Sequence, residues 1–280
     1  MSALVRYFLA KGYKVAGYDR TQSPLTTELK TEGLEIVYEE SVESIPDYCR
    51  NPETTLVVYT PAIPASHAGL VYFREHGFRV VKRAELLGLI TQSSRGLCFA
   101  GTHGKTTTSS MAAHIFHESP IGCNAFLGGI LRNYNSNLIL SEQSPFTVIE
   151  ADEYDRSFHW LHPYMAVVTA TDPDHLDIYG TEEAYLESFA HFTSLIQPGG
   201  CLIMKKGIRL VPNVKEGVKI YTYSARDGGD FHAGNIRIGD GTIVFDFVTP
   251  EGVFADIELG VPVEINIENA VAAMAIAWLN

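Results

Sequence analysis

A glycine turn followed by a lysine and three threonines constrains the fold of this chain more than any other stretch. The apolar run Cys98 to Ala100 leads into Gly101-Thr102-His103-Gly104-Lys105-Thr106-Thr107-Thr108. Apolar residues at helical spacing follow, among them Met111 and Ile115. A strand, a glycine turn and a helix in this order are typical of a phosphate-binding loop, or P-loop.

The residue types in this stretch suit phosphate chemistry. Gly101 and Gly104 can take backbone angles closed to other residues, and they leave no Cβ between the backbone amides and a phosphate. The start of the helix adds free N–H groups and the positive end of the helix dipole. Lys105 would then reach the β- and γ-phosphates, and the Thr106 hydroxyl would bind Mg²⁺.

The match to the general P-loop pattern is incomplete. The pattern G-x-x-x-x-G-K-[ST] has a glycine five residues before Gly104, where this chain has Phe99. An ordinary loop that carries Gly-x-x-Gly-Lys-Thr by chance is therefore the alternative. The strand before the turn and the helix after it favour the P-loop.

Composition narrows the class of protein. The chain has 280 residues, 46% of them hydrophobic, and a net charge of −12. This length allows one large domain or two ordinary ones, and the charge argues against a nucleic-acid partner. Four cysteines without a C-x-x-C pair indicate free thiols in a reducing compartment. With no leader segment and no apolar run long enough to span a membrane, the sequence predicts a soluble cytoplasmic protein.

The first 91 residues predict a small parallel α/β unit. Residues 2–10 have helical spacing, and residues 14–19 form a strand that ends in Asp19. Two more β-rich segments follow, at residues 55–59 and 79–81. An acid at such a strand end can contact a ribose hydroxyl, so Asp19 is a candidate, and an ordinary strand-end acid is the alternative. Residues 92–96 are polar between apolar blocks and are the best linker candidate.

Two later strands end in acidic clusters. The strand at residues 146–149 runs into Glu150-Ala151-Asp152-Glu153, and the strand at 165–169 runs toward Asp174-His175-Leu176-Asp177. In a parallel sheet, ligands bind beyond the carboxyl ends of the strands. Both clusters should therefore lie at the same edge as the P-loop, as a Mg²⁺–nucleotide site requires. Singly, the acids could cap helices and His175 could be structural.

The remaining residues complete the prediction of fold class. Aromatic and aliphatic residues at helical spacing predict a core-facing helix that needs no ligand; they are Tyr185, Phe189, Phe192 and Ile196. Short strands at residues 218–221, 236–238 and 243–247 predict an antiparallel meander. A final helix from Asn266 stops at Asn280 without a cap, so we expect further chain beyond it. The sequence thus predicts an α/β protein, with a partial Rossmann-like domain and a P-loop domain whose mostly parallel sheet carries the meander.

Four of these segments, in this order, resemble the Mur ligases, the ATP-dependent enzymes of peptidoglycan precursor synthesis. They are residues 101–108, 150–153, 174–177 and 266–269. The resemblance implies a UDP-substrate-binding domain at 1–91, without its first strand and glycine loop, and a central ATP-binding domain at 92–280. The family's C-terminal ligase domain is absent, so the chain alone is expected to be inactive. Ala170 departs from the family, in which many members have asparagine.

The resemblance also implies site residues. It implies a catalytic set of Lys105, Glu150 and His175, and Mg²⁺ ligands at Thr106, Glu150 and His175. The ATP-binding set is Gly101, Thr102, His103, Gly104, Lys105, Thr106, Thr107, Asn266 and Asn269. The residues expected to face the substrate are Thr60, Pro61, Asn124, Gly128 and Gly129, together with Asp19.

The family members with the nearest likeness join L-alanine to the lactyl carboxylate of UDP-N-acetylmuramate through an acyl phosphate. The resemblance therefore implies ATP, Mg²⁺, UDP-N-acetylmuramate and L-alanine as ligands, and no nucleic acid or membrane partner. Three alternatives stay open: a ligase that recycles a tripeptide onto the same UDP-sugar, a nucleotide-binding fragment without catalysis, and a P-loop kinase. Nothing in the sequence gives the oligomeric state.

Overall fold

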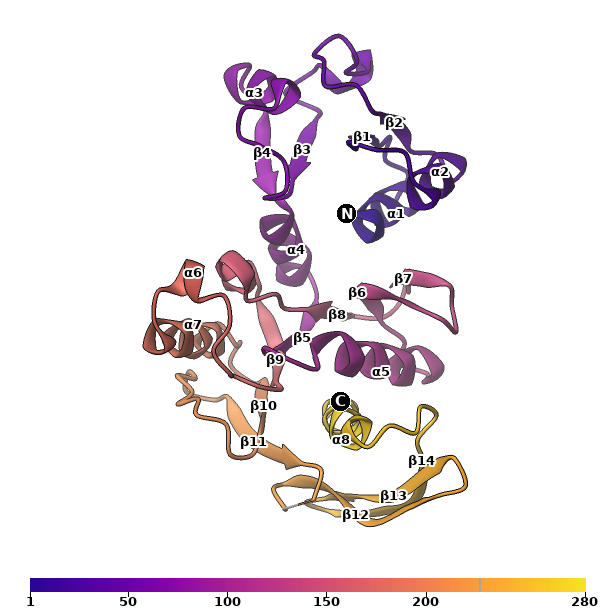
Figure 1. Cartoon of the computed structure of the whole chain (residues 1–280), viewed down its shortest axis with the longest axis vertical. Helices are drawn as coiled ribbons and strands as arrows, with labels where there is room; N and C mark the ends of the chain where they lie inside the picture. Colours follow the sequence, from indigo (N-terminus) through magenta and orange to yellow (C-terminus); the bar gives the residue numbers. More distant parts are fainter. Residues whose placement is uncertain (227) are drawn as a thin grey trace. The chain divides into compact units, whose positions relative to one another are not determined.

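Two units make up the fold of this chain. The computed structural model describes residues 1–226 and 228–280, and it divides into unit 1, Met1–Leu87, and unit 2, Gly88–Asn280 (Figure 1). The division falls inside helix α4 (Arg83–Gln92), and strand β5 (Arg95–Ala100) follows after only Ser93 and Ser94. The segment predicted as a linker is therefore mostly the end of a helix and the start of a strand.

Unit 1 has helices beside two separate pairs of parallel strands. The pairs are β1 with β2 and β3 with β4, so the predicted parallel unit is present as two pairs rather than one sheet. A capping box between Ser23 and Thr26 begins α2. The bounds are α1 Ser2–Ala10, β1 Ala16–Tyr18, α2 Pro24–Thr31, β2 Glu35–Val37, η1 Asp47–Cys49, β3 Leu56–Tyr59, α3 Ala68–Glu75 and β4 Arg79–Lys82.

Unit 2 is built on one sheet, which has ten strands among the described residues. Their order is β14-β13-β12-β11-β10-β9-β5-β8-β6-β7. The strands after β5 are β6 Asn124–Leu131, β7 Ser136–Ile139, β8 Phe146–Glu150, β9 Pro163–Val168, β10 Cys201–Lys205, β11 Lys219–Ser224, β12 Phe231–Gly239, β13 Thr242–Thr249 and β14 Gly252–Glu258. The helices are α5 Lys105–Glu118, η2 Tyr154–Trp160, α6 Leu176–Tyr179, α7 Glu182–Ser194 and α8 Ile265–Trp278.

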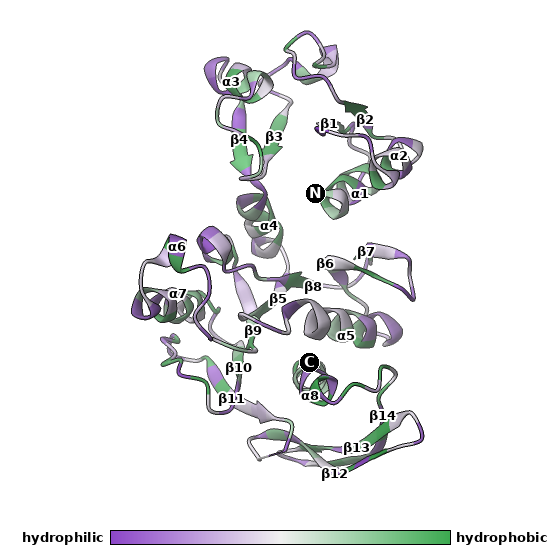
Figure 2. Ribbon diagram, viewed as in Figure 1, coloured by the Kyte–Doolittle hydropathy of each residue, from purple (hydrophilic) through white to green (hydrophobic). Residues whose placement is uncertain are grey.

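The register of the central strands determines where the site can form. β5 lies between β8 and β9 and is parallel to both, with Cys98 opposite Ile149 on one side and Ala166 on the other. The three strands therefore end at one edge of the sheet. They are buried on both faces and are mostly hydrophobic (Figure 2), because helices cover both sides of a parallel sheet.

Alternate residues of β5 face two different helical layers. Leu97 and Phe99 belong to an apolar cluster with residues of α5 and α8, and these two helices pack against each other. Cys98, between them, points to the opposite face. The stripe predicted as core-facing is confirmed, since its four residues in α7 and the turn after it are 0% exposed.

The predicted meander is correct for two of its three strands, β12 and β13, and wrong for β11, while β14 lies beyond the three predicted segments. β12, β13 and β14 are antiparallel neighbours, whereas β11 runs parallel to both β10 and β12. The thirteen-residue connection from β10 to β11, residues 206–218, is long enough for the crossover that a parallel pair requires. The antiparallel β6–β7 hairpin was not predicted. In the described part of the chain, no helix is long and apolar enough to cross a membrane.

Candidate functional site

The glycine turn lies between β5 and α5, as the sequence predicts. Gly101 has a φ of 137° and Gly104 a φ of 86°, both in the range that favours glycine. A Cβ on Gly101 would come within 2.8 Å of the Ala170 backbone nitrogen and closer still to the Thr169 hydroxyl. Thr102 donates its backbone N–H to the Ala170 carbonyl oxygen at 3.1 Å. The loop is therefore packed tightly against the segment that follows β9.

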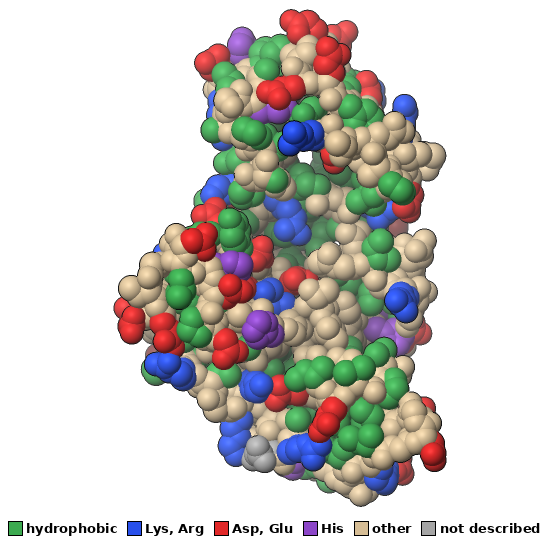
Figure 3. Space-filling view, viewed as in Figure 1, with side chains coloured by type: hydrophobic (Ala, Val, Ile, Leu, Met, Phe, Trp, Pro, Cys, Tyr) green, Lys and Arg blue, Asp and Glu red, His purple; other side chains and the backbone are tan. Residues whose placement is uncertain are grey.

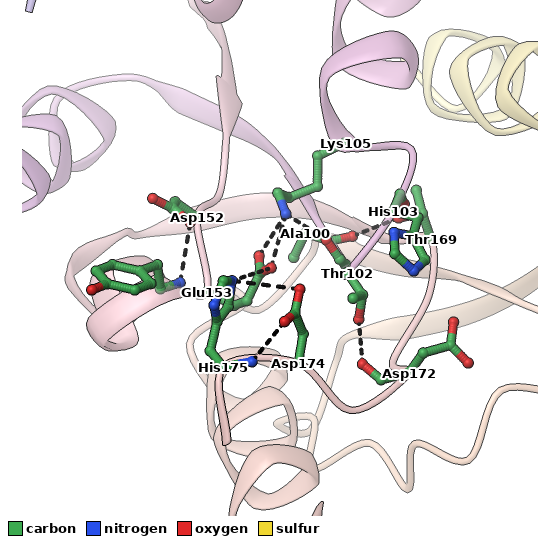
Figure 4. Close-up of polar contacts among 12 residues, drawn as sticks. Ala100, Thr102, His103, Lys105, Asp152, Glu153, Thr169, Asp172, Asp174 and His175 are labelled. Atoms are coloured by element: carbon green, nitrogen blue, oxygen red, sulfur yellow. Dashed lines mark hydrogen bonds and ion pairs between the residues drawn. The ribbon is translucent and has the colours of Figure 1, made fainter. Parts of the chain in front are cut away.

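Lys105, the first residue of α5, is held at the mouth of this loop (Figure 4). Its Nζ donates to the Gly101 carbonyl oxygen at 2.7 Å and lies 2.9 Å and 2.7 Å from the two carboxylate oxygens of Glu153. Glu153 is 1% exposed. Burial raises the pKa of Glu153, and the hydrogen bond and charge of Lys105 oppose that shift. The pair thus places a cation and its counter-charge beside the glycine turn.

His175 joins this pair from the loop after β9. Its φ is 54°, and its backbone N–H donates to Asp174 Oδ1 at 2.8 Å. The ring Nε2 lies 3.7 Å from Asp174 Oδ2 and 4.0 Å from Glu153 Oε1, and the ring meets the Tyr154 ring edge-on, with centroids 5.1 Å apart. Lys105, Glu153 and His175 come from three different strand ends and converge on one point.

The glycines of β6 lie against the Glu150 carboxylate and the Thr106 side chain at the same edge. Gly128 donates its backbone N–H to Glu150 Oε2 at 3.2 Å, and a Cβ on Gly128 would lie 2.9 Å from Glu150 Cδ. A Cβ on the next residue, Gly129, would lie 3.5 Å from Thr106 Cγ2. A larger residue at Gly128 would therefore collide with the Glu150 carboxylate.

The Thr106 hydroxyl and the Glu150 carboxylate form a donor set that suits a hydrated divalent cation. Mg²⁺ usually takes one or two protein carboxylates, with waters and substrate phosphates completing its shell. Within residues 1–226 and 228–280, no group of three or more His, Cys, Asp or Glu side chains forms a closed cage. A hydroxyl at Thr106 and a carboxylate at Glu150 fit an open site of this kind.

Two asparagines of α8 lie beside the start of α5. Asn269 Oδ1 accepts from the Thr108 hydroxyl at 3.1 Å, and Asn269 Nδ2 donates to Asn266 Oδ1 at 3.1 Å. A Cβ on Gly104 would lie 3.0 Å from Asn269 Oδ1. The first turn of α8 is tied to β10 by an ion pair between Glu268 and Lys205 at 2.8 Å. The predicted pair of asparagines is thus adjacent to the glycine turn.

Some predicted residues of unit 2 lie elsewhere or have other partners. Asn124 lies opposite Thr147 at the start of β6, and its Oδ1 accepts from the Ser141 backbone N–H at 3.1 Å. It is therefore remote from the carboxyl edge that holds Gly128. His103 is exposed, and its carbonyl oxygen accepts from the Thr169 hydroxyl. Thr107 is half-buried in the first turn of α5.

The predicted residues of unit 1 are described within that unit alone. Asp19 is exposed after β1, and its Oδ1 accepts from the Thr21 backbone N–H at 3.2 Å. Thr60 and Pro61 follow β3, and the Thr60 carbonyl oxygen accepts from the Ile63 backbone N–H at 3.1 Å. Their predicted role toward a substrate stays a prediction.

Sequence reasoning did not single out Glu153 or Thr169. Glu153 closes the Glu-Ala-Asp-Glu run, but its pairing with Lys105 joins residues 48 positions apart. Thr169 bonds the carbonyl oxygens of Ala100 and His103, and a threonine at a strand end carries no pattern that indicates this contact. Its place as the last of three acids in the run Glu150-Ala151-Asp152-Glu153 was the one available signal for Glu153.

Charged groups of both signs surround the site. On the face of unit 2 that Figure 3 shows, acidic, basic and histidine side chains are intermixed rather than gathered in one basic patch. A cationic point such as Lys105 within this mixed surface suits a small anionic ligand better than an extended polyanion.

The loop after Glu153 has an unusual backbone and is anchored on α7. Asp155 and Arg156 have φ of 51° and 54°, a conformation that costs of order 1–3 kcal/mol per non-glycine residue. His159, a few residues on, has its Nε2 3.0 Å from the Ser188 carbonyl oxygen and 3.0 Å from the Ser188 Oγ. This contact holds the loop in place.

We expect stability to fall on mild acidification through His159. Burial lowers the pKa of His159 from its usual 6.5, and the charge of neighbouring His191 adds to this. Below pH 6.5 the unfolded chain therefore binds a proton that the folded chain resists, so unfolding becomes easier as pH falls. Both melting temperatures should fall between pH 7.5 and 5.5. Since His159 is only half-buried, we expect the fall for His159→Gln to be smaller than the fall for wild type by about 1–2 °C. Equal drops in both proteins would contradict this.

Two family descriptions match this chain. Residues 99–277 match the Mur ligase middle domain, and residues 1–95 match the description "Mur ligase family, catalytic domain". Among curated proteins, the UDP-N-acetylmuramate–L-alanine ligase of Parabacteroides distasonis is 68% identical over 280 residues, 100% of this chain and 61% of that protein. The ligase of the same name from Flavobacterium johnsoniae is 46% identical over 279 residues, 99% of this chain and 60% of that protein. The chain thus spans only part of the length of these relatives.

Solved structures match the fold. The UDP-N-acetylmuramate:L-alanyl-gamma-D-glutamyl-meso-diaminopimelate ligase from Neisseria meningitides has a TM-score of 0.85 at 22% identity, covering 99% of this chain and 89% of that one. The UDP-N-acetylmuramate–alanine ligase of Thermotoga maritima has a TM-score of 0.82 at 23% identity, covering 99% of this chain and 61% of that one. The predicted fold class, α/β with a mostly parallel sheet and a few antiparallel strands, is confirmed.

Proposed function

This chain belongs to the Mur ligase family, and from that premise we propose that it forms part of an ATP-dependent ligase that joins L-alanine to UDP-N-acetylmuramate. The name shared by relatives at 68% and 46% identity supports this substrate pair. In this proposal residues 1–91 serve the UDP-sugar and residues 92–280 serve ATP. The reaction takes place in the cytoplasm and supplies peptidoglycan synthesis.

The proposed reaction activates a carboxylate. A lactyl carboxylate oxygen attacks the γ-phosphorus of ATP, ADP leaves, and an acyl phosphate forms. The amine of L-alanine then attacks the acyl carbon, and the tetrahedral intermediate expels phosphate as the amide forms. A carboxylate is a poor nucleophile and a poor acylating agent. The main contributions of a protein to this reaction are therefore positioning and charge neutralisation.

Each residue of the site has a role in this proposal. Lys105 binds the β- and γ-phosphates, and Glu153 holds its ammonium group at the glycine turn until they arrive. Thr106 and Glu150 would hold Mg²⁺, and His175 would hold a second ion near the acceptor carboxylate. Bound Mg²⁺ supplies neutralisation of the charge on the phosphoryl oxygens. Asn266 and Asn269 would contact the adenine.

One observation carries the proposal more than any other. The Lys105 ammonium group contacts both the Gly101 carbonyl oxygen and the buried Glu153 carboxylate, while His175 lies 4.0 Å from the same carboxylate. An ammonium group, a buried carboxylate and an imidazole brought together beside a glycine turn are the kind of fixed groups on which phosphoryl transfer relies. An isolated structural ion pair would not require the glycine turn beside it.

The test is ADP release by the full gene product that contains this chain. Mg²⁺, ATP and UDP-N-acetylmuramate are supplied in two reactions, one with L-alanine and one with the tripeptide L-alanyl-γ-D-glutamyl-meso-diaminopimelate. We expect release that depends on L-alanine. Release with the tripeptide alone would assign the protein to recycling, and release in neither reaction would contradict the ligase proposal.

A further inference from the structure

One member of the buried aromatic stripe of α7 carries a polar atom that reaches the glycine turn. Tyr185 is 0% exposed, and its hydroxyl lies 2.9 Å from Thr102 Oγ1. Phe189, Phe192 and Ile196, which share its stripe, have no polar side-chain atom. Phenylalanine at this position would pack equally well, so packing does not account for the hydroxyl group of Tyr185.

The direction of the hydrogen bonds follows from counting protons. The Thr102 hydroxyl donates to the Asp172 carbonyl oxygen at 2.7 Å, and a hydroxyl has one proton to donate. The Tyr185 hydroxyl is therefore the donor to Thr102 Oγ1. The result is a one-way chain from Tyr185 through Thr102 to Asp172 (the last two labelled in Figure 4).

This chain of bonds joins two of the loops that form the site. Thr102 lies in the glycine turn, three residues before Lys105, and Asp172 lies in the loop that leads to His175. A second buried tyrosine, Tyr179, meets the Tyr185 ring edge-on with centroids 4.9 Å apart. The Tyr179 hydroxyl donates to the carbonyl oxygen of Glu153. The two tyrosines thus bond to the loops after β5 and β8, and Thr102 extends the link to the loop after β9.

We propose that Tyr185 is a positioning residue, which sets the glycine turn relative to the His175 loop by donating to Thr102. The proposal rests on the proposed ATP-dependent function. It also assigns the Thr102 side chain to this link, so Thr102 contributes its position and not a hydroxyl to phosphate binding. Burial raises the pKa of Tyr185, which keeps the hydroxyl protonated, and therefore a donor, at any ordinary assay pH.

The first experiment compares Tyr185→Phe with a matched control, Tyr164→Phe. Tyr164 is near the opposite end of β9, away from the site edge. In the full gene product, we expect Tyr185→Phe to lower kcat about tenfold and to raise KM for ATP, because small displacements of positioned groups have large effects on rate. KM for L-alanine should stay unchanged. Tyr164→Phe should match wild type in all three constants.

Variants of Thr102 separate positioning from folding. Thr102→Ser keeps the hydroxyl and should stay within about twofold of wild type, whereas Thr102→Val should lose activity about a hundredfold. The double variant Tyr185→Phe/Thr102→Val should be no worse than Thr102→Val, since the bond is already gone. Additive losses, or equal kinetics for Thr102→Ser and Thr102→Val, would overturn the proposal. If Tyr185→Phe does not fold, the comparison of Thr102→Ser with Thr102→Val tests the proposal by itself.

Binding of ATP with Mg²⁺, measured by calorimetry on the same proteins, distinguishes this proposal from the ligase proposal. If wild type binds ATP but catalyses no ligation, the ligase proposal fails. Weaker ATP binding by Tyr185→Phe than by Tyr164→Phe would then still support the positioning role. Equal binding by these two variants, or no binding by wild type, would overturn it.

Discussion

Replacing Lys105 with methionine in the full gene product is expected to lower kcat for ligation by about 10²–10³-fold. Methionine replaces the aliphatic part of the side chain but removes the charged group that would neutralise the phosphoryl oxygens. The loss of one preorganised electrostatic group in a dry site typically has an effect of this size. The measurement is steady-state ADP release with L-alanine as acceptor.

The same replacement is expected to destabilise the fold, for a reason separate from catalysis. Lys105→Met leaves the Glu153 carboxylate, 1% exposed, without its cation, and an uncompensated buried charge costs about 2–4 kcal/mol. Since Lys105 is what opposes the rise in the pKa of Glu153, that pKa rises further in the variant. The destabilisation should therefore shrink as pH falls and the carboxyl group of the folded variant takes up a proton.

The double variant Lys105→Met/Glu153→Gln separates the two effects. Glutamine removes the buried charge, so most of the free energy of unfolding should return while ligation stays lost. Urea unfolding measures the first quantity and ADP release the second. Activity within tenfold of wild type in either variant would contradict the assignment of Lys105 to the phosphates.

Replacing Gly101 with alanine is the second change with a large expected effect. At a φ of 137° a Cβ is strained in any surroundings, at a cost of about 1–3 kcal/mol. The new Cβ would also overlap the Ala170 backbone nitrogen and the Thr169 hydroxyl, and overpacking adds about 1–3 kcal/mol. We therefore expect about 2–6 kcal/mol of destabilisation in urea unfolding, with ATP binding weakened at least tenfold as the turn shifts.

Gly207 provides the matched control for Gly101. It also has a positive φ, 85°, but no atom lies within 4 Å of an added Cβ. Gly207→Ala should therefore show only the backbone cost, about 1 kcal/mol, and should bind ATP as wild type does. Equal effects of the two substitutions would mean that contacts of the turn with the β9 loop are unimportant.

The features that the sequence predicted correctly depend on local patterns. The order of strand, glycine turn and helix around Lys105 can be recognised from a dozen residues. The aromatic stripe of α7 follows helical spacing. Glu150 and His175 were expected at one edge with Lys105 because parallel strands end together. The register of β5 with β8 and β9 agrees with this reasoning.

The features that the sequence did not predict depend on partners distant along the chain. The direction of β11 is set by its crossover from β10, and a strand's periodicity is the same in either direction. The resemblance implied that Asn124 and Gly128 both face the substrate, but both belong to β6, an extended strand that places them at different points along the sheet. The partners of Glu153 and Tyr185 lie 48 and 83 residues away, beyond the reach of any local pattern.

Oxygen tracing tests the proposed chemistry most directly. UDP-N-acetylmuramate labelled with ¹⁸O in both lactyl carboxylate oxygens is given to the full gene product with ATP, Mg²⁺ and L-alanine. If the carboxylate attacks the γ-phosphorus and phosphate later leaves the acyl carbon, each released phosphate carries one ¹⁸O atom and the amide keeps the other. Unlabelled phosphate formed together with the amide product would contradict activation through an acyl phosphate.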